Sequence, residues 1–221
     1  MKSKKLISEK DIIMEVGSIC ACNSTHAFSQ MIDRSINLEA PTLDIVKFKD
    51  VEELLKRSNN IVIGVHCRIL SGIFGQVSLL FREKSAYEFV SMFAAKGKHS
   101  TGFLTELGVS TIKEIGNVVV SAYAGAMSLL MDVSVIPSIP VLSSGPLKEV
   151  LKLGMVNFSE EDTIYVHTMI FRDEERKIDG SFFLVLEPVT VKQIAKSMRK
   201  QLRNVTKLQK KIEGALKNER T

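Results

Sequence analysis

The most constraining feature of this sequence is that it repeats itself. When the segment around Glu15 is shifted by 99 positions, it registers with the segment around Glu114, and the glycine two residues later coincides as well. Further matches follow without a gap: Ala27 with Ala126, Ser29 with Ser128, Asp33 with Asp132, Ser35 with Ser134 and Pro41 with Pro140. Agreement at so many spaced positions predicts two copies of one structural unit.

Each copy has the same predicted layout. A long helix rich in small residues comes first, a strand and a proline-marked turn follow, and two apolar strand-like runs lead into a closing helix. The expected helices are 9–33, 85–93, 110–131 and from 190 onward, and the expected strands are 61–69, 75–81, 163–171 and 181–186. Asp179 and Gly180 are typical of a hairpin turn.

This layout predicts the α+β class. We expect two pseudo-symmetric αβ repeats that share one core, with long helices and mainly antiparallel strands. Repeat one should span about residues 8–95 and repeat two about 107–198, within one domain over 1–200. Residues 201–221 should form a basic C-terminal helical extension.

The positive charge of the chain belongs to its C-terminal end. Residues 192–221 hold 10 Lys and Arg against 2 Glu, a net charge of +8, whereas the other 191 residues hold 20 basic and 23 acidic side chains, a net charge of −3. The globular body is therefore not expected to bind nucleic acid. The tail is compatible with a solvated helix, a coiled-coil surface or a landing site for an acidic partner.

Composition also argues against a membrane span, a disulfide framework and a metal site. The most apolar run, 115–131, is interrupted by polar residues and is shorter than the roughly 20 residues a span needs. The N-terminus lacks the apolar region of a signal peptide. The three cysteines and four histidines have no metal-ligand spacing. We therefore expect a cytoplasmic protein without membrane insertion and with no metal of its own.

Candidate chemistry lies in the first helix of the second copy. Glu114 and Asn117 are three residues apart, so on a helix they share one face. The carboxylate can pair with a lysine, and the amide can donate and accept hydrogen bonds at once. Hydrolysis of an acyl phosphate requires chiefly a water held in line with phosphorus, a task that an amide can perform.

A structural explanation competes with this interpretation. Thr111 and Glu114 match a capping box, in which the glutamate bonds back to the cap residue, and Asn117 could simply face solvent. In the first copy, however, Ser8 and Asp11 are a plausible cap, so Glu15 lies deeper in its helix and capping does not explain it. A glutamate at matching positions in both copies favours function over capping.

At this point the sequence resembles a known family, the CheC/CheX/FliY chemotaxis phosphatases. Their motif is Asp or Ser, three residues, Glu, two residues, Asn, about 21 to 22 residues, and Pro. Ser110, Glu114, Asn117 and Pro140 match it, with 22 residues before the proline. In the first copy Asp11, Glu15 and Pro41 match with the same gap, and residues 20–29 are similar to the family's next stretch. The resemblance covers about residues 8–198 and is strongest to the doubled, CheC-like form.

The resemblance implies a CheC-like fold and a phosphatase that acts on an aspartyl-phosphorylated CheY-type response regulator in two-component chemotaxis signalling. Asn117 would orient the attacking water and Glu114 would dock the receiver. Ser18 replaces the family's asparagine, so Glu15 and Ser18 mark a degenerate second site. The resemblance also implies a possible CheD-like deamidase partner. Mg²⁺ would belong to the receiver rather than to this chain.

One alternative from another class stays open. The chain could be a non-catalytic adaptor that binds a receiver domain or a CheD-like deamidase, with Glu114 and Asn117 serving only to dock it. The intact Asn117 favours the enzyme, whereas Ser18 indicates that one copy has already lost its amide.

Overall fold

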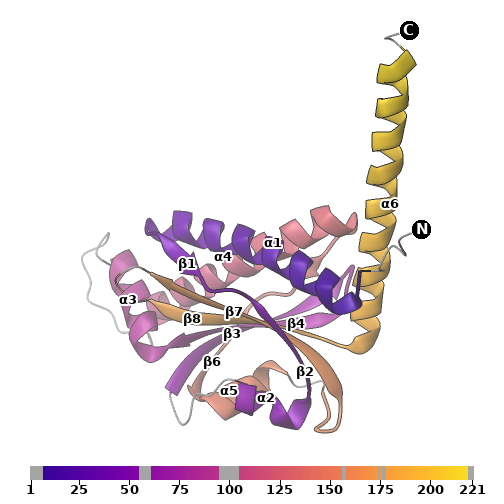
Figure 1. Ribbon diagram of the computed structural model, residues 1–221. Helices are drawn as coiled ribbons and strands as arrows, with labels where there is room; N and C mark the ends of the chain where they lie inside the picture. Colours follow the sequence, from indigo (N-terminus) through magenta and orange to yellow (C-terminus); the bar gives the residue numbers. More distant parts are fainter. Residues whose placement is uncertain are drawn as a thin grey trace.

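The computed structural model describes residues 7–54, 61–94, 105–155, 158–173, 175 and 178–218. It confirms the α+β class, with helices packed on one antiparallel sheet (Figure 1). The elements of the first copy are α1 (Glu9–Ile32), β1 (Ile36–Leu38), β2 (Thr42–Lys47), η1 (Phe48–Asp50), α2 (Val51–Leu54), β3 (Ile61–Ser71), β4 (Gly75–Arg82) and α3 (Glu83–Ala94). Those of the second are α4 (Glu106–Met131), β5 (Ile136–Pro137), β6 (Val141–Pro146), α5 (Leu147–Gly154), β7 (Thr163–Asp173), β8 (Asp179–Leu186) and α6 (Pro188–Asn218).

The strand order interlocks the two copies. It runs β1-β7-β8-β4-β3-β5, with β2 also paired to β7 and β6 also paired to β3. The first strands of each copy therefore pair with the long strand of the other copy, and the pseudo-two-fold axis passes between β8 and β4. Each half supplies the edge strands of the other half, so the hydrogen bonds of the sheet join the two copies into one core.

Helices cover both faces of the sheet. Helices α1 and α4 lie side by side on one face and run in opposite directions, while α2 and α5 cover the other face (Figure 1). The larger apolar cluster lies under α1, α4 and the start of α6, with Phe28, Phe81 and Tyr123 buried in it. A smaller cluster lies under α5 on the opposite face. The core thus draws on both copies at once.

The ends of the two long helices show how closely the copies match. Helix α1 ends at Asp33 and α4 at Asp132, both left-handed, with φ of 56° and 55°. The hydroxyls of Ser29 and Ser128 each accept the backbone N–H of the residue seven positions later, at 3.2 and 2.9 Å. Identical residues therefore direct each helix into its following strand in the same way.

The expected turn at Asp179 and Gly180 is wrong. Both residues lie in β8, where they pair with Arg172 and Phe171, and the chain reverses between Asp173 and Asp179. Gly180 serves packing instead, because a Cβ atom there would lie 2.3 Å from the Phe171 ring. The predicted hairpin of β7 and β8 is present, but its glycine is needed for close packing against an aromatic ring and not for the turn.

Helix α4 is long and apolar enough to qualify as a membrane span by length and composition. Half of its most apolar window is buried inside the protein, against α1 and the sheet, as in a core helix. Helix α6 starts in the same core and then leaves the body, continuing through residue 200 as one uninterrupted helix (Figure 1). The division of the chain at about residue 200 stays a prediction.

Candidate functional site

Glu114 and Asn117 lie on the outer face of α4, and both side chains are exposed. The opposite face of the helix is apolar and buried, so the register of α4 is fixed by its core contacts. Those buried neighbours are Ile112, Ile115, Gly116, Val119 and Val120. A carboxylate and an amide therefore stand beside each other on a rigid element that presents them to solvent.

The capping explanation for Glu114 is wrong. Helix α4 begins earlier than the sequence suggested, with Thr105 as its N-cap and the Thr105 hydroxyl accepting the N–H of Gly108 at 3.2 Å. Glu114 thus lies in about the third turn. The Thr111 hydroxyl donates to the carbonyl of Leu107 at 2.9 Å and caps nothing. The expected cap of the first copy, Ser8 with Asp11, is confirmed.

Neither side chain of the pair is engaged elsewhere. Among the described residues, Glu114 and Asn117 make no hydrogen bond and no ion pair, and the Glu114 carboxylate is free to meet a cation from outside. The Asn117 amide has both its donors and its acceptor available. Neither side chain therefore stabilises the described part of the chain through a polar contact.

A glycine between the two residues seats the helix on the sheet. A Cβ atom at Gly116 would lie 2.4 Å from Cγ1 of Val65 in β3, and one at Gly17 would lie 2.4 Å from Nε2 of His167 in β7. Each helix therefore approaches the long strand of the other copy where only glycine fits. This close contact fixes the height and rotation of Glu114 and Asn117 above the sheet.

The segment that contains Pro140 returns alongside α4. A Cβ atom at Gly116 would meet Val65 of β3, and Val65 pairs with Leu142 of β6. The chain that follows Pro140 therefore passes beside α4 near Gly116, the residue before Asn117. Its neighbours Ile139 and Val141 are 87% and 64% exposed. The polar pair is thus flanked by exposed apolar side chains.

The first copy has the frame of this site without its chemistry. Glu15 is exposed on α1, but the Ser18 hydroxyl donates to the backbone carbonyl of Met14 at 2.7 Å. With its hydrogen bonded to Met14, the hydroxyl is left with acceptor capacity alone, whereas an asparagine amide can donate and accept at once. Around Pro41 the chain has Ala40 and Thr42 in place of the exposed isoleucine and valine. Both the amide and the apolar border are therefore missing.

The two helices meet at the pseudo-symmetry axis. The Asn23 amide donates to the carbonyl of Ala122, its matching position, and the Ser24 hydroxyl donates to the carbonyl of Val119, both at 2.9 Å. The two helices run in opposite directions (Figure 1), and Ser18 and Asn117 each precede this contact by five residues. The two candidate sites therefore lie on opposite sides of it.

The two cysteines of α1, Cys20 and Cys22, have different environments. Cys20 is fully buried, and burial raises the pKa of its thiol to about 12, whereas Cys22 is exposed. Cys20 packs into the core between α1 and the sheet and cannot obstruct a partner that approaches from outside. Only Cys22 borders the outer surface of the first copy.

Two buried histidines lie under the helices. Burial lowers the pKa of both His66 and His167 to about 4. His66 hydrogen-bonds Ser78 at 2.9 Å and Ser143 at 2.7 Å, whereas neither ring nitrogen of His167 has a partner among the described residues. In the part of the chain that the structure describes, no three His, Cys, Asp or Glu side chains converge on a metal-sized site.

Sequence reasoning missed the apolar border of the site. Ile139 and Val141 look like ordinary strand residues, and only their high exposure distinguishes them. A comparison of the two copies around Pro41 and Pro140 carries the signal, because the substitutions run from small or polar to large and apolar.

The comparisons with known proteins agree with this geometry. No family model matches the chain. It is 24% identical to the CheY-P phosphatase CheC of Bacillus subtilis over 182 residues, which cover 80% of this chain and 87% of that protein.

Solved structures show the same fold. The FliY structure from Thermotoga maritima superposes with a TM-score of 0.70 and 22% identity, covering 88% of this chain and 98% of that one. The FliM middle domain from H. pylori gives a TM-score of 0.61 and 11% identity, covering 89% and 99%. The chain therefore has the fold of FliY and of the FliM middle domain, and the resemblance to the CheC/CheX/FliY family that its two motif copies carry is confirmed.

Proposed function

We propose that this chain is a phosphatase that removes phosphate from an aspartyl-phosphorylated CheY-type response regulator. The observation that carries the proposal is the exposed, unengaged pair of Glu114 and Asn117 on a helix held rigidly by Gly116. The similarity to a CheY-P phosphatase supports the same substrate class. The Ser18 copy is proposed to be silent, so the protein has one working site.

The proposed chemistry needs little covalent participation from the chain. The oxygen of the Asn117 amide accepts a hydrogen bond from a water molecule and its NH2 group donates one to the phosphoryl group, which holds the water in line with phosphorus. The water oxygen bonds to phosphorus, the bond to the aspartyl oxygen breaks, and inorganic phosphate and a free carboxylate result. The attacking water releases its proton to the phosphate or to solvent.

The side chains around the Asn117 amide are proposed to bind the receiver. Glu114 pairs with a lysine of the receiver and so sets the orientation of α4 over the acyl phosphate. Ile139 and Val141 add apolar area at the border of the contact. Mg²⁺, if required, is held by the receiver. A CheD-like deamidase is a further proposed partner, and the setting is the cytoplasm.

The adaptor remains the second candidate because the fold also serves protein binding. FliM of H. pylori, whose middle domain has this fold, has been solved in complex with FliG and with SpeE. An adaptor would bind a receiver through the same surface without shortening the life of its phosphate. The two candidates therefore differ in turnover and share binding.

The test is the decay of a phosphorylated CheY-type receiver, measured with and without catalytic amounts of this protein. The phosphatase predicts multiple turnovers per molecule and a rate that saturates with receiver concentration. Binding of the phosphorylated receiver with an unchanged decay rate would establish the adaptor and reject the enzyme.

A further inference from the structure

A groove lies away from the phosphatase site, where α6 leaves the body. Its volume is about 690 Å³, and it is bounded by α6, the end of α4 and the turn between β3 and β4. The floor is apolar: Phe74 from the turn is 63% exposed, and Met131 and Val133 come from the end of α4. An exposed aromatic ring at the base of a groove is an anchor point for a partner side chain.

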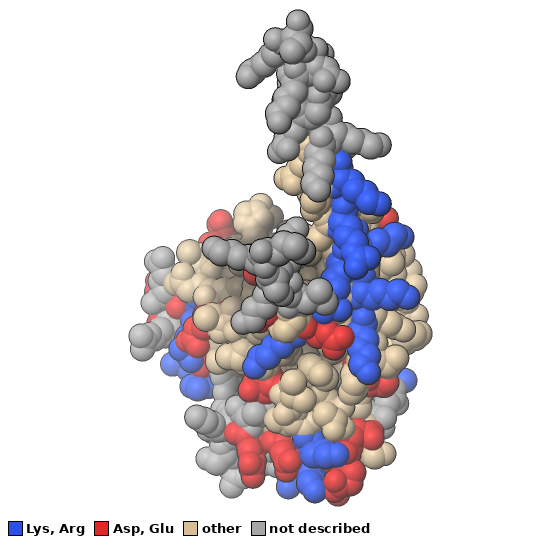
Figure 2. Space-filling view, turned by 45° about the vertical axis from the view of Figure 1, so that its right-hand side comes forward, with Lys and Arg blue, Asp and Glu red and all other residues tan. Residues whose placement is uncertain are grey.

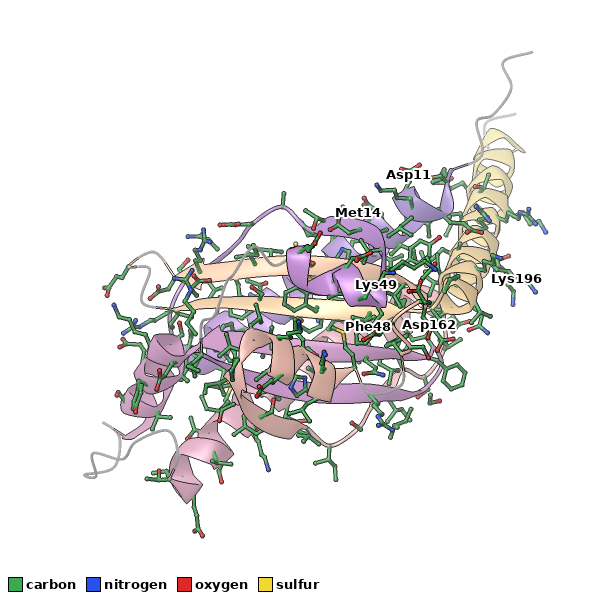
Figure 3. All side chains as sticks on the ribbon, turned by 90° about the horizontal axis from the view of Figure 1, so that it is seen from below. Asp11, Met14, Phe48, Lys49, Asp162 and Lys196 are labelled. Carbon is green, nitrogen blue, oxygen red and sulfur yellow. The ribbon has the colours of Figure 1, made fainter. Side chains whose placement is uncertain are left out.

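One wall of this groove is a row of cations. Lys196, Arg199, Lys200 and Arg203 line it from one face of α6, at spacings of three and four residues. Figure 2 shows the resulting stripe of Lys and Arg along α6, and Lys196 projects from the helix in Figure 3. The row spans about 10 Å, the length of three or four residues of extended peptide.

The positive charge of the row is not neutralised within the described part of the chain. No acidic side chain lines the groove, and Lys196, Lys200 and Arg203 take part in no ion pair there. Arg199 donates to the carbonyl of Ile7, yet its Nε is buried without a hydrogen-bond partner. Clustered like charges repel one another, so an anionic occupant would relieve a cost that the free protein carries.

We infer that this groove binds a short acidic segment of a partner protein, with an apolar side chain seated against Phe74 and carboxylates paired along α6. The combination of an apolar floor and one cationic wall selects this chemistry. The apolar floor favours a peptide over a nucleic acid, whose phosphates would pair with the cationic wall but leave Phe74 unused, and a membrane would require the apolar residues on a convex face. The site is independent of Asn117 and would exist whether the chain is a phosphatase or an adaptor.

The test uses a fluorescent peptide that alternates Glu with Leu, and measures its anisotropy on the full chain. The double variant Lys196→Glu/Arg203→Glu is expected to weaken binding by about tenfold or more, and the wild-type affinity should fall as salt rises. Lys192→Glu is the matched control, because Lys192 is exposed on α6 but does not line the groove. Phe74→Ser should also weaken binding, whereas Leu153→Ser on α5 should not.

Three results would overturn the inference. Equal loss of affinity in the Lys192 control would mean diffuse charge attraction without a site. Tighter binding of an oligothymidine or of phosphatidylserine vesicles than of the peptide would assign the surface to another class of partner. Self-association that is abolished by Lys196→Glu/Arg203→Glu would give the groove to a second copy of this chain. Receiver dephosphorylation by the groove variants should stay unchanged.

Discussion

At the scale of single residues, a substitution at Glu114 distinguishes a role in docking the receiver from a role in stabilising the helix. The structure removes its capping role, so Glu114→Gln should leave the melting temperature nearly unchanged and weaken receiver binding, by about 2–5 kcal/mol if the ion pair is buried in the complex and by less if it stays hydrated. Glu15→Gln is the matched control in the degenerate copy and should change neither. A loss of stability without a loss of binding would restore a structural role for Glu114.

The degenerate copy offers a gain-of-function test at the same scale. Ser18→Asn in an Asn117→Ala background should recover part of the lost phosphatase activity, because the longer amide replaces a hydroxyl that hydrogen-bonds the carbonyl of Met14 within its own helix. Adding Ala40→Ile and Thr42→Val should raise the recovery by supplying the apolar border of the intact site. If both variants fold and bind the receiver but do not make its phosphate decay faster than it does alone, the first copy has lost more than these side chains.

At the scale of elements, the glycines of the motif set the height of the helices. Gly116→Ala places a methyl group 2.4 Å from Val65 Cγ1 and should cost about 1–3 kcal/mol in the free energy of unfolding, with a drop in activity as α4 is displaced. Gly125→Ala in the same helix meets nothing within 4 Å and should stabilise by about 0.5–1 kcal/mol. Chemical denaturation of both variants measures the contrast. Equal effects would mean that Gly116 makes no critical contact.

The elements also show what the sequence could and could not reveal. The repeat predicts both long helices and their strands because the residues that end each helix recur at the same spacing, as Asp33 and Asp132 do. It could not reveal that the copies exchange strands, because pairing across the axis leaves no local signal. Helix α4 starts earlier than expected because the spacing of Thr111 and Glu114 imitates a capping box, whereas the actual cap is Thr105. The exposure of Ile139 depends on tertiary packing, which local pattern does not encode.

At the scale of the whole molecule, the interlocked sheet predicts that the two copies unfold together. The free energy of unfolding should depend on pH because two histidines are buried in the folded protein. Burial lowers the folded-state pKa values of His66 and His167 from the usual 6.5 to about 4, so between these values the unfolded chain binds more protons. The stabilisation is complete above pH 6.5 and is lost as pH falls toward 4.

Urea unfolding at pH 7 and pH 5 measures this dependence. Each histidine should contribute about 1–2 kcal/mol to the difference. His167→Leu should reduce the pH dependence, and a substitution at the exposed His26 serves as the control. The same pH dependence in His167→Leu as in the wild type would show that His167 does not titrate with folding.

Removal of the chain after Lys200 tests the independence of the tail. The core contacts of α6 come from Val191, Ile194 and Ala195, and the Ser197 hydroxyl donates to the carbonyl of Met131 at 2.8 Å. The truncated protein should therefore melt as the full chain does and keep its phosphatase activity, while losing Arg203 from the groove and part of its affinity for an acidic peptide. Unfolding after truncation would mean that the projecting half of α6 supports the body.

The most direct measurement of the central claim is the half-life of a phosphorylated CheY-type receiver in the presence of Asn117→Ala. Asn117 is exposed and makes no hydrogen bond with the described residues, so its replacement should leave folding and receiver binding intact. The acceleration should fall by a factor on the order of 10² or more, the usual loss for a positioned catalytic donor. A variant that binds the receiver and dephosphorylates it as fast as the wild type would contradict the assignment of this helix face as the active site.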